Sequence, residues 1–220
     1  RQRQMCIRDR GSDILLLHGF PSSMYMWNDI KKELVENGYR VTILEQRGYP
    51  LSRLKNFDLL SFNIEELSKD VEELILKLNL DQNLTIVGHD WGSIVAWAVI
   101  SREKVNINKL VSLCGGTEFP ISAVYSNLTY NEKLHYISSF QNVRESANII
   151  DSNLELFFRS AYRMNNQIGD SVDLSLENIF INNLSESCVM KENEIINLIQ
   201  HFDKFSLDQP IAWYANIDLS

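Results

Sequence analysis

The stretch that decides the fold is residues 85–97, which read Thr-Ile-Val-Gly-His-Asp-Trp-Gly-Ser-Ile-Val-Ala-Trp. A short β-branched run ends at Gly88, two glycines flank Asp90, and an apolar run compatible with a helix follows. A strand, a tight turn and a helix in this order are typical of a nucleophile elbow. Glycines are needed because the backbone is pinched and a Cβ beside the central residue would clash. The turn is expected to expose Asp90 above a helix N-terminus, which favours negative charge.

An aspartate at the centre of this turn restricts the chemistry. A serine alkoxide attacks carbonyls, whereas a carboxylate suits displacement at saturated carbon and forms an alkyl-enzyme ester. The substrate would therefore carry a strained or good leaving group on carbon, as an epoxide or an alkyl halide does. The glycines and Asp90 could instead form only a tight turn, but the strand–turn–helix context favours a nucleophile. A serine hydrolase is not expected, because no Gly-x-Ser-x-Gly occurs.

The composition of the 220 residues is ordinary for a soluble globular protein, with 45% hydrophobic and 23% charged residues. The formal net charge of −8 argues against nucleic acid and anionic membranes as partners. No apolar stretch approaches the ~18 residues that span a bilayer. No metal-ligand spacing or phosphate-binding glycine loop occurs, so neither a metal nor a cofactor is expected. No signal peptide is visible, and a cytoplasmic protein is the default expectation.

The first ten residues do not read as part of a folded protein. They show no periodicity and contain four of the arginines. Arg8-Asp9-Arg10 resembles the end of a translated sequencing adapter, so we interpret residues 1–10 as a non-native scar. A basic N-terminal arm is the alternative. Outside this segment only Cys114 and Cys188 remain, too few for a disulfide framework.

Residues 11–119 alternate between strand and helix patterns. Short apolar runs predict strands at 14–17, 40–44, 84–87 and 109–113, of which the first has the pattern of a strand buried on both faces. Helical patterns occupy residues 25–37, 64–78 and 91–101, and Asn63 with Glu66 marks a capping box at the start of the second. This alternation predicts an α/β fold with a mostly parallel, doubly wound sheet.

The pattern changes near Pro120. No further strand is convincing, and apolar residues recur at helical spacing around 154–161 and 195–202. Asp208-Gln209-Pro210 is expected to begin a last short helix, since proline is tolerated in the first turn. We therefore expect residues 120–220 to form an all-helical cap domain over the carboxyl ends of the strands.

A loop reading His18-Gly19-Phe20-Pro21 follows the first predicted strand. In enzymes with a nucleophile elbow, an N–H from this loop and the N–H after the nucleophile form the oxyanion hole. The donors here would be the backbone amides of Phe20 and Trp91. His18 could be a catalytic base, but a structural hydrogen-bonding role within the loop is favoured.

Together these features resemble the α/β-hydrolase superfamily, specifically its epoxide hydrolase-like branch with an aspartate nucleophile. The resemblance extends over almost everything from residue 12 onward. The matching segments are 18–21, 47–49, 88–92, Phe140-Gln141 and Trp213-Tyr214. The elbow does not separate epoxide hydrolases from haloalkane dehalogenases, in which Trp91 would match a halide-binding tryptophan. The resemblance implies a small apolar epoxide or halogenated substrate, with His18, Trp91 and Phe140 in its pocket.

The cap supplies the feature that distinguishes the two activities. In epoxide hydrolases two cap tyrosines bind the epoxide oxygen and protonate the leaving alkoxide, and by resemblance these are Tyr136 and Tyr214. A phenol of pKa ~10 can donate this proton, whereas a halide needs none. Both tyrosines could instead be ordinary packing residues.

Three positions depart from the family pattern. Ser93 stands where a glycine is usual after the elbow, Pro50 replaces a small residue, and Val143 replaces an expected proline. These departures concern the shape of the substrate pocket more than the fold.

Hydrolysis of the ester requires a histidine oriented by a carboxylate, and in this superfamily both follow the cap. The histidines after Asp90 are His135 and His201, both inside the cap, and neither is expected to complete a triad. We therefore interpret the chain as a fragment that lacks this acid and histidine and is inactive in turnover. The alternatives are a haloalkane dehalogenase and a non-catalytic ligand-binding relative. The sequence does not indicate the substrate's stereochemistry or the oligomeric state.

Overall fold

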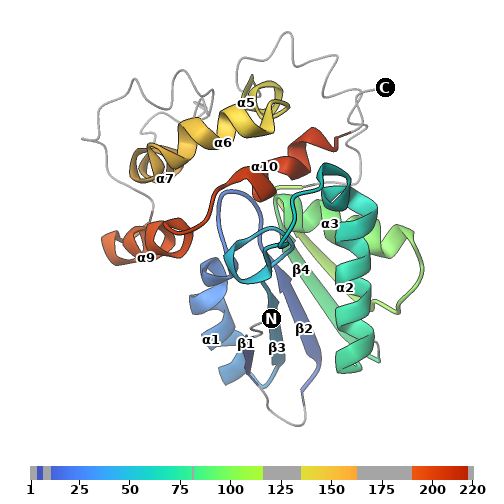
Figure 1. The fold of residues 1–220 in the computed structure, drawn as a ribbon. Coiled ribbons are helices and arrows are strands. Elements are labelled where there is room, and N and C mark those ends of the chain that lie inside the picture. The colour runs from blue at the N-terminus through green and yellow to red at the C-terminus, as the bar shows by residue number, and fades with distance from the viewer. Residues whose placement is uncertain (1–3, 7–10, 81, 116–134, 163–189, 218–220) are drawn as a thin grey trace. The chain divides into compact units, whose positions relative to one another are not determined.

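The structure is a computed structural model that describes residues 4–6, 11–80, 82–115, 135–162 and 190–217 (Figure 1). The chain divides into two compact units, Arg1–Glu118 and Phe119–Ser220. Within the described parts, no helix is both long and apolar enough to cross a membrane.

The first unit is built on a five-stranded sheet with the order β1-β3-β2-β4-β5. Its strands are β1 (Gln4–Cys6), β2 (Asp13–Leu17), β3 (Arg40–Leu44), β4 (Leu84–His89) and β5 (Lys109–Leu113). Strands β2 to β5 pair in parallel, which confirms the predicted α/β fold class. Strand β1 pairs antiparallel with β3, within the segment interpreted as a scar. Backbone pairing depends little on side-chain identity, so that interpretation stays a prediction.

The register of the parallel strands determines which loops meet. All five residues of β2 are buried, as expected for a central strand covered on both faces. Leu17 at its end is aligned with Leu44 of β3 and with Gly88 of β4. The loops that follow these strands therefore all leave the sheet at the carboxyl ends of the strands, where α/β proteins bind their ligands.

Among the described residues of the first unit, helix α1 covers one side of the sheet, and helices α2 and α3 cover the other (Figure 1). They are α1 (Asn28–Glu36), α2 (Ile64–Leu78) and α3 (Trp91–Ser101). The helix predicted at 25–37 begins instead with a 3₁₀ turn, η1 (Met24–Trp27), capped by Ser23. Asn63 caps α2 as predicted, because its Oδ1 accepts a hydrogen bond of 2.9 Å from the Glu66 amide. The predicted capping box is not completed, since the Asn63 amide donates to the Leu60 carbonyl and the Glu66 carboxylate pairs with Lys69.

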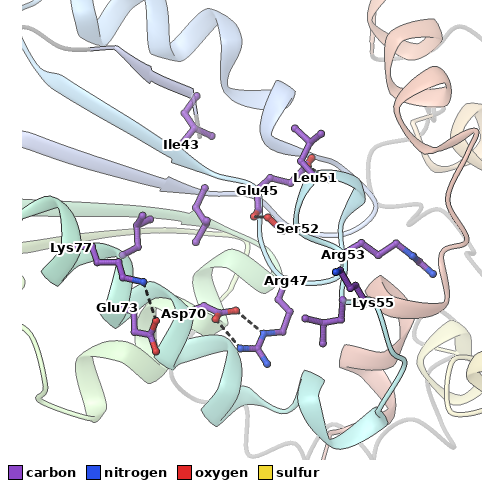
Figure 2. Close-up of a pocket in the computed structure, with 13 residues that line it drawn as sticks. Ile43, Glu45, Arg47, Leu51, Ser52, Arg53, Lys55, Asp70, Glu73 and Lys77 are labelled. Carbon is purple, nitrogen blue, oxygen red and sulfur yellow. Dashed lines mark hydrogen bonds and ion pairs between the residues drawn. The ribbon is translucent and has the colours of Figure 1, made fainter. Parts of the chain in front are cut away.

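The loop after β3 is anchored by charged side chains. Arg47 donates from Nε and Nη2 to the Asp70 carboxylate at 2.6 and 2.8 Å, and from Nη1 to the Ser61 carbonyl at 2.8 Å. The buried Glu45 carboxylate accepts a 2.7 Å hydrogen bond from the Leu51 amide. Figure 2 shows Arg47 directed towards Asp70 on α2, beside a cavity of about 400 Å³. Asp90 does not line this cavity.

Replacing Arg47 with lysine is expected to lower the free energy of unfolding by about 1 kcal/mol, because a lysine cannot form the bidentate pair with Asp70. Urea denaturation monitored by circular dichroism would measure this change. The control is Arg144→Lys, since Arg144 is exposed on α6 (Val143–Asp151) and should shift stability by less than about 0.5 kcal/mol. Equal effects of the two substitutions would contradict an anchoring role.

In the second unit, every regular element within residues 135–162 and 190–217 is a helix, and the apolar stripes predicted two of them, at 154–161 and 195–202. Beside α6 they are α5 (His135–Ser139), α7 (Leu154–Ala161), α9 (Glu192–Phe202) and α10 (Asp208–Ala215). Pro210 lies in the first turn of α10, as expected. The rings of Phe158 and Phe202 lie 5.2 Å apart, and Arg159 on α7 pairs with Glu192 on α9 at 2.7 Å. Apolar packing and one ion pair thus join α7 to α9.

Candidate active site

The elbow places Asp90 directly between β4 and α3. Its backbone has φ 53° and ψ −122°, outside the regions that ordinary residues populate. Such a conformation persists only where the surroundings impose it, and it is typical of functional sites. The sequence prediction of a strand, a tight turn and a helix is confirmed.

The two flanking glycines allow backbones to pack directly against each other. A Cβ on Gly92 would lie 2.7 Å from the carbonyl oxygen of His18, and a Cβ on Gly88 would lie 2.6 Å from the Ser93 nitrogen. Neither approach is sterically possible, so both positions require glycine. The prediction that a Cβ at either position beside Asp90 would clash is therefore confirmed.

Two backbone amides contact the Asp90 carboxylate. The Phe20 N–H donates to Oδ1 at 2.8 Å, and the Trp91 N–H also hydrogen-bonds the carboxylate. The loop approaches this closely because Gly19 has no side chain, and a Cβ there would lie 2.5 Å from Asp90 Oδ1. The structure thus brings together the nucleophile candidate and both amides named from the sequence. Their function as an oxyanion hole stays a prediction.

The environment of Asp90 raises its pKa above the ordinary value of an aspartate. Burial raises the pKa of the Asp90 carboxyl, while the hydrogen bonds from Trp91 and Phe20 and the charge of His89 oppose this shift only in part. Burial disfavours a charge, whereas amide donors favour it. A carboxylate that is partly desolvated but still held by two donors is suited to nucleophilic attack.

The perturbed pKa predicts a pH-dependent stability difference between the wild type and Asp90→Asn. Because the folded pKa of Asp90 exceeds the unfolded value of ~3.9, the folded state favours the acid form. That stabilisation is complete below the unfolded pKa and is lost as the pH rises through the folded pKa. We expect the variant to have the higher Tm at neutral pH, with the difference shrinking on acidification. Scanning calorimetry across this range tests it, and a pH-independent difference would contradict it.

His18 holds two loops together. Its ring is fully buried, its Nε2 accepts from the Gln46 amide at 3.1 Å, and its Nδ1 lies 3.2 Å from the Gly19 carbonyl oxygen. This pattern corresponds to a neutral ring with its proton on Nδ1. The Tyr49 ring contacts it edge-on, with centroids 4.3 Å apart. The structural role favoured by the sequence is therefore confirmed, whereas contact with substrate stays a prediction.

The cap residues named from the sequence form one aromatic cluster in the second unit. Tyr136 on α5 lies 5.8 Å from Tyr214 on α10, measured between ring centroids, and Phe140 lies 5.0 Å from Tyr214. Gln141 fixes the cluster, because its side-chain amide donates to the Tyr214 carbonyl at 2.9 Å. The sequence named Gln141 only as part of a matching pair and did not predict this bridge. The roles of the two tyrosines towards a substrate stay predictions.

Other candidate groups give no further cluster. Among the described residues, no group of three or more His, Cys, Asp or Glu side chains could hold a metal ion. His201 lies on α9, where its ring packs edge-on against Phe202 with centroids 5.5 Å apart. The side chain of His135 lies outside the described residues.

Comparison with known proteins defines the class. The family model for the alpha/beta hydrolase fold matches residues 14–203, and the chain therefore belongs to the α/β hydrolase fold family. It is 41% identical over 106 residues to AB hydrolase superfamily protein YfhM of Bacillus subtilis (strain 168), covering 48% of this chain and 36% of that protein.

Two further similarities are to epoxide hydrolases. The chain is 25% identical over 221 residues to bifunctional epoxide hydrolase 2 of Sus scrofa, covering 94% of this chain and 38% of that protein. It thus spans little more than a third of the curated relatives it matches. Epoxide hydrolase A from Mycobacterium thermoresistibile shares its fold with a TM-score of 0.80 and 20% identity, over 97% of this chain and 70% of that one.

Proposed function

We propose that this chain carries the nucleophilic half of an epoxide hydrolase, in which Asp90 opens an epoxide through an alkyl-enzyme ester. The observation that carries the proposal is the Asp90 carboxylate, held at the elbow by the amides of Phe20 and Trp91. Relatives that are named epoxide hydrolases support the choice of substrate class.

The proposed first step is attack by Asp90 on the epoxide. We assign the attack on the less hindered epoxide carbon to Oδ2, the oxygen that does not accept the hydrogen bond from the Phe20 amide. A C–O bond forms to the aspartate as the ring C–O bond breaks. The electron pair of that bond stays on the former ring oxygen, which takes a proton from a phenol, and Tyr136 and Tyr214 are proposed as the donors. The product of this step is a β-hydroxyalkyl ester of Asp90.

The second step releases a diol. Water adds to the ester carbonyl carbon, negative charge develops on the carbonyl oxygen, and the proposed oxyanion hole of the Phe20 and Trp91 amides would stabilise it. The acyl C–O bond to the alkyl group then breaks, the Asp90 carboxyl is restored, and the leaving oxygen takes a proton to become the second hydroxyl of the diol. A base must take the proton of this water. His18 is not proposed as that base, because its ring is fully buried and both of its nitrogens lie at hydrogen-bonding distance from backbone groups.

The test marks Asp90 itself. The protein is mixed in ¹⁸O-labelled water with less than one molar equivalent of styrene oxide, and the reaction is quenched with acid. The protein is then digested, and the mass of the peptide containing Asp90 is measured by mass spectrometry. A trapped ester adds the mass of the epoxide, whereas a hydrolysed ester leaves one ¹⁸O in the carboxylate, because water attacks the carbonyl carbon. Either mark supports the proposal. Diol formation with neither mark, or no reaction with styrene oxide or a small aliphatic epoxide, would overturn it.

A further inference from the structure

Ser93, the third residue after the nucleophile, connects the elbow to the neighbouring strand. Its side chain is fully buried. Its Oγ lies 2.6 Å from the carbonyl oxygen of Gly88, 3.0 Å from the carbonyl oxygen of Leu113 and 3.1 Å from the Leu113 nitrogen. Gly88 precedes the turn on β4 and Leu113 ends β5, so one hydroxyl bridges the two strands where they leave the sheet.

This hydroxyl both donates and accepts. A serine has one proton to donate and two lone pairs to accept with. Two carbonyl oxygens, those of Gly88 and Leu113, lie within reach of the proton, and the Leu113 N–H donates to the hydroxyl oxygen. An alanine at this position would leave the buried Gly88 carbonyl and the part-buried Leu113 N–H without this partner, which is costly away from water.

The backbone groups of Asp90 form hydrogen bonds with the same two residues, Leu113 and Ser93. Its N–H donates to the Leu113 carbonyl at 2.9 Å, and its carbonyl accepts from the Ser93 N–H at 2.9 Å. Gly115 closes the other side, because a Cβ there would lie 2.7 Å from the Ser93 Cβ and 3.1 Å from the Asp90 carbonyl oxygen. The residue with the unusual backbone is thus fixed on both sides, through Leu113 and through Ser93.

We propose that Ser93 is a positioning residue that holds the strained backbone of Asp90, and with it the attacking oxygen, by fastening the elbow to the end of β5. This inference rests on the proposed nucleophilic role of Asp90. Ser93 does not touch the substrate, so its loss should slow ester formation without weakening substrate binding. Misplacing a reacting group by about 1 Å can cost a hundredfold in rate, so even partial loosening is measurable.

The test compares Ser93→Ala and Ser93→Cys with Ser68→Ala. Ser68 is an equally buried serine on α2, where its hydroxyl donates only within its own helix, to the Ile64 carbonyl at 2.6 Å. We expect Ser93→Ala to slow the marking of Asp90 by about tenfold at saturating epoxide, with the half-saturating concentration changed less than twofold. Cysteine keeps a weak donor, so Ser93→Cys should fall between alanine and wild type. Ser68→Ala should react at nearly the wild-type rate.

A second measurement does not depend on activity. Hydrogen exchange of peptides covering residues 88–93 and 109–115 should be faster in Ser93→Ala than in wild type, and unchanged in Ser68→Ala. The inference would be overturned if Ser93→Ala showed both the wild-type exchange rate in these peptides and the wild-type rate of Asp90 marking. If Ser93→Ala does not fold, the same two measurements on Ser93→Cys decide. Wild-type protein without any mark on Asp90 would instead refute the proposed function, and the inference would fall with it.

Discussion

Replacing Asp90 with asparagine is expected to reduce formation of the covalent ester by about ten-thousandfold or more, since removing a catalytic nucleophile commonly costs that much. An amide oxygen is a far weaker nucleophile than a carboxylate. Asparagine keeps the size of the side chain and can still accept the 2.8 Å hydrogen bond from the Phe20 amide. The loss is therefore chemical rather than structural. Single-turnover mass spectrometry of the peptide containing residue 90 measures it.

The control for this experiment is Asp58→Asn. Asp58 caps a short helix, η3 (Leu59–Phe62), by accepting a 3.3 Å hydrogen bond from the Leu60 amide, and asparagine can cap equally well. Its rate of ester formation should stay within twofold of wild type. An epoxide adduct that formed on Asp90→Asn as fast as on wild type would show that a different nucleophile reacts.

The elbow was predictable because its determinants are local. A strand that ends in glycine, a central aspartate and an apolar helix lie within 13 consecutive residues, 85–97. Each follows from local sterics or periodicity. The Phe20 amide was predicted from the known layout of enzymes with a nucleophile elbow. The structure gives the physical reason for its contact with Asp90, because β2 lies beside β4 in parallel and the two strands align their carboxyl ends.

The support of the elbow was not predictable in the same way. Ser93 reads only as a departure from a glycine, and nothing near it in the sequence indicates Leu113, 20 residues later. That contact depends on the register between β4 and β5, in which His89 is aligned with Leu113. Register is set by packing across the whole sheet rather than by local pattern.

In the second unit, too, local features were predictable from the sequence and long-range contacts were not. Apolar stripes predicted α7 and α9, since helical periodicity is a local property, and Pro210 predicted the start of α10, whereas α5 and α6 were not predicted. The contact between Tyr136 and Tyr214 joins residues 78 positions apart, and Gln141 completes it by bonding the Tyr214 carbonyl. Before the structure was known, only the family resemblance indicated that these two tyrosines lie close together.

Replacing Tyr136 and Tyr214 together with phenylalanine is expected to slow epoxide opening by about a hundredfold to ten-thousandfold, the usual contribution of general acid catalysis. The packing should survive, because phenylalanine keeps the edge-on ring contacts at 5.8 and 5.0 Å. A halide leaves without a proton, so any reaction of Asp90 with a primary alkyl bromide should be unaffected. The rates of Asp90 alkylation by the two substrates are measured on the same variant.

The comparison of the two substrates separates three explanations. Loss with the epoxide alone supports proton donation by the tyrosines and the assignment to epoxides. An equal loss of rate with both substrates would mean that the tyrosines act through packing. The control is Tyr39→Phe, which removes a hydroxyl at a partly exposed site and gives the baseline rate for such a change. An unchanged epoxide rate together with fast bromide displacement would replace the proposed activity with dehalogenation. Because an aspartate held by two amides suits either reaction, the proposal assigns the choice between them to the phenols of Tyr136 and Tyr214 rather than to the elbow.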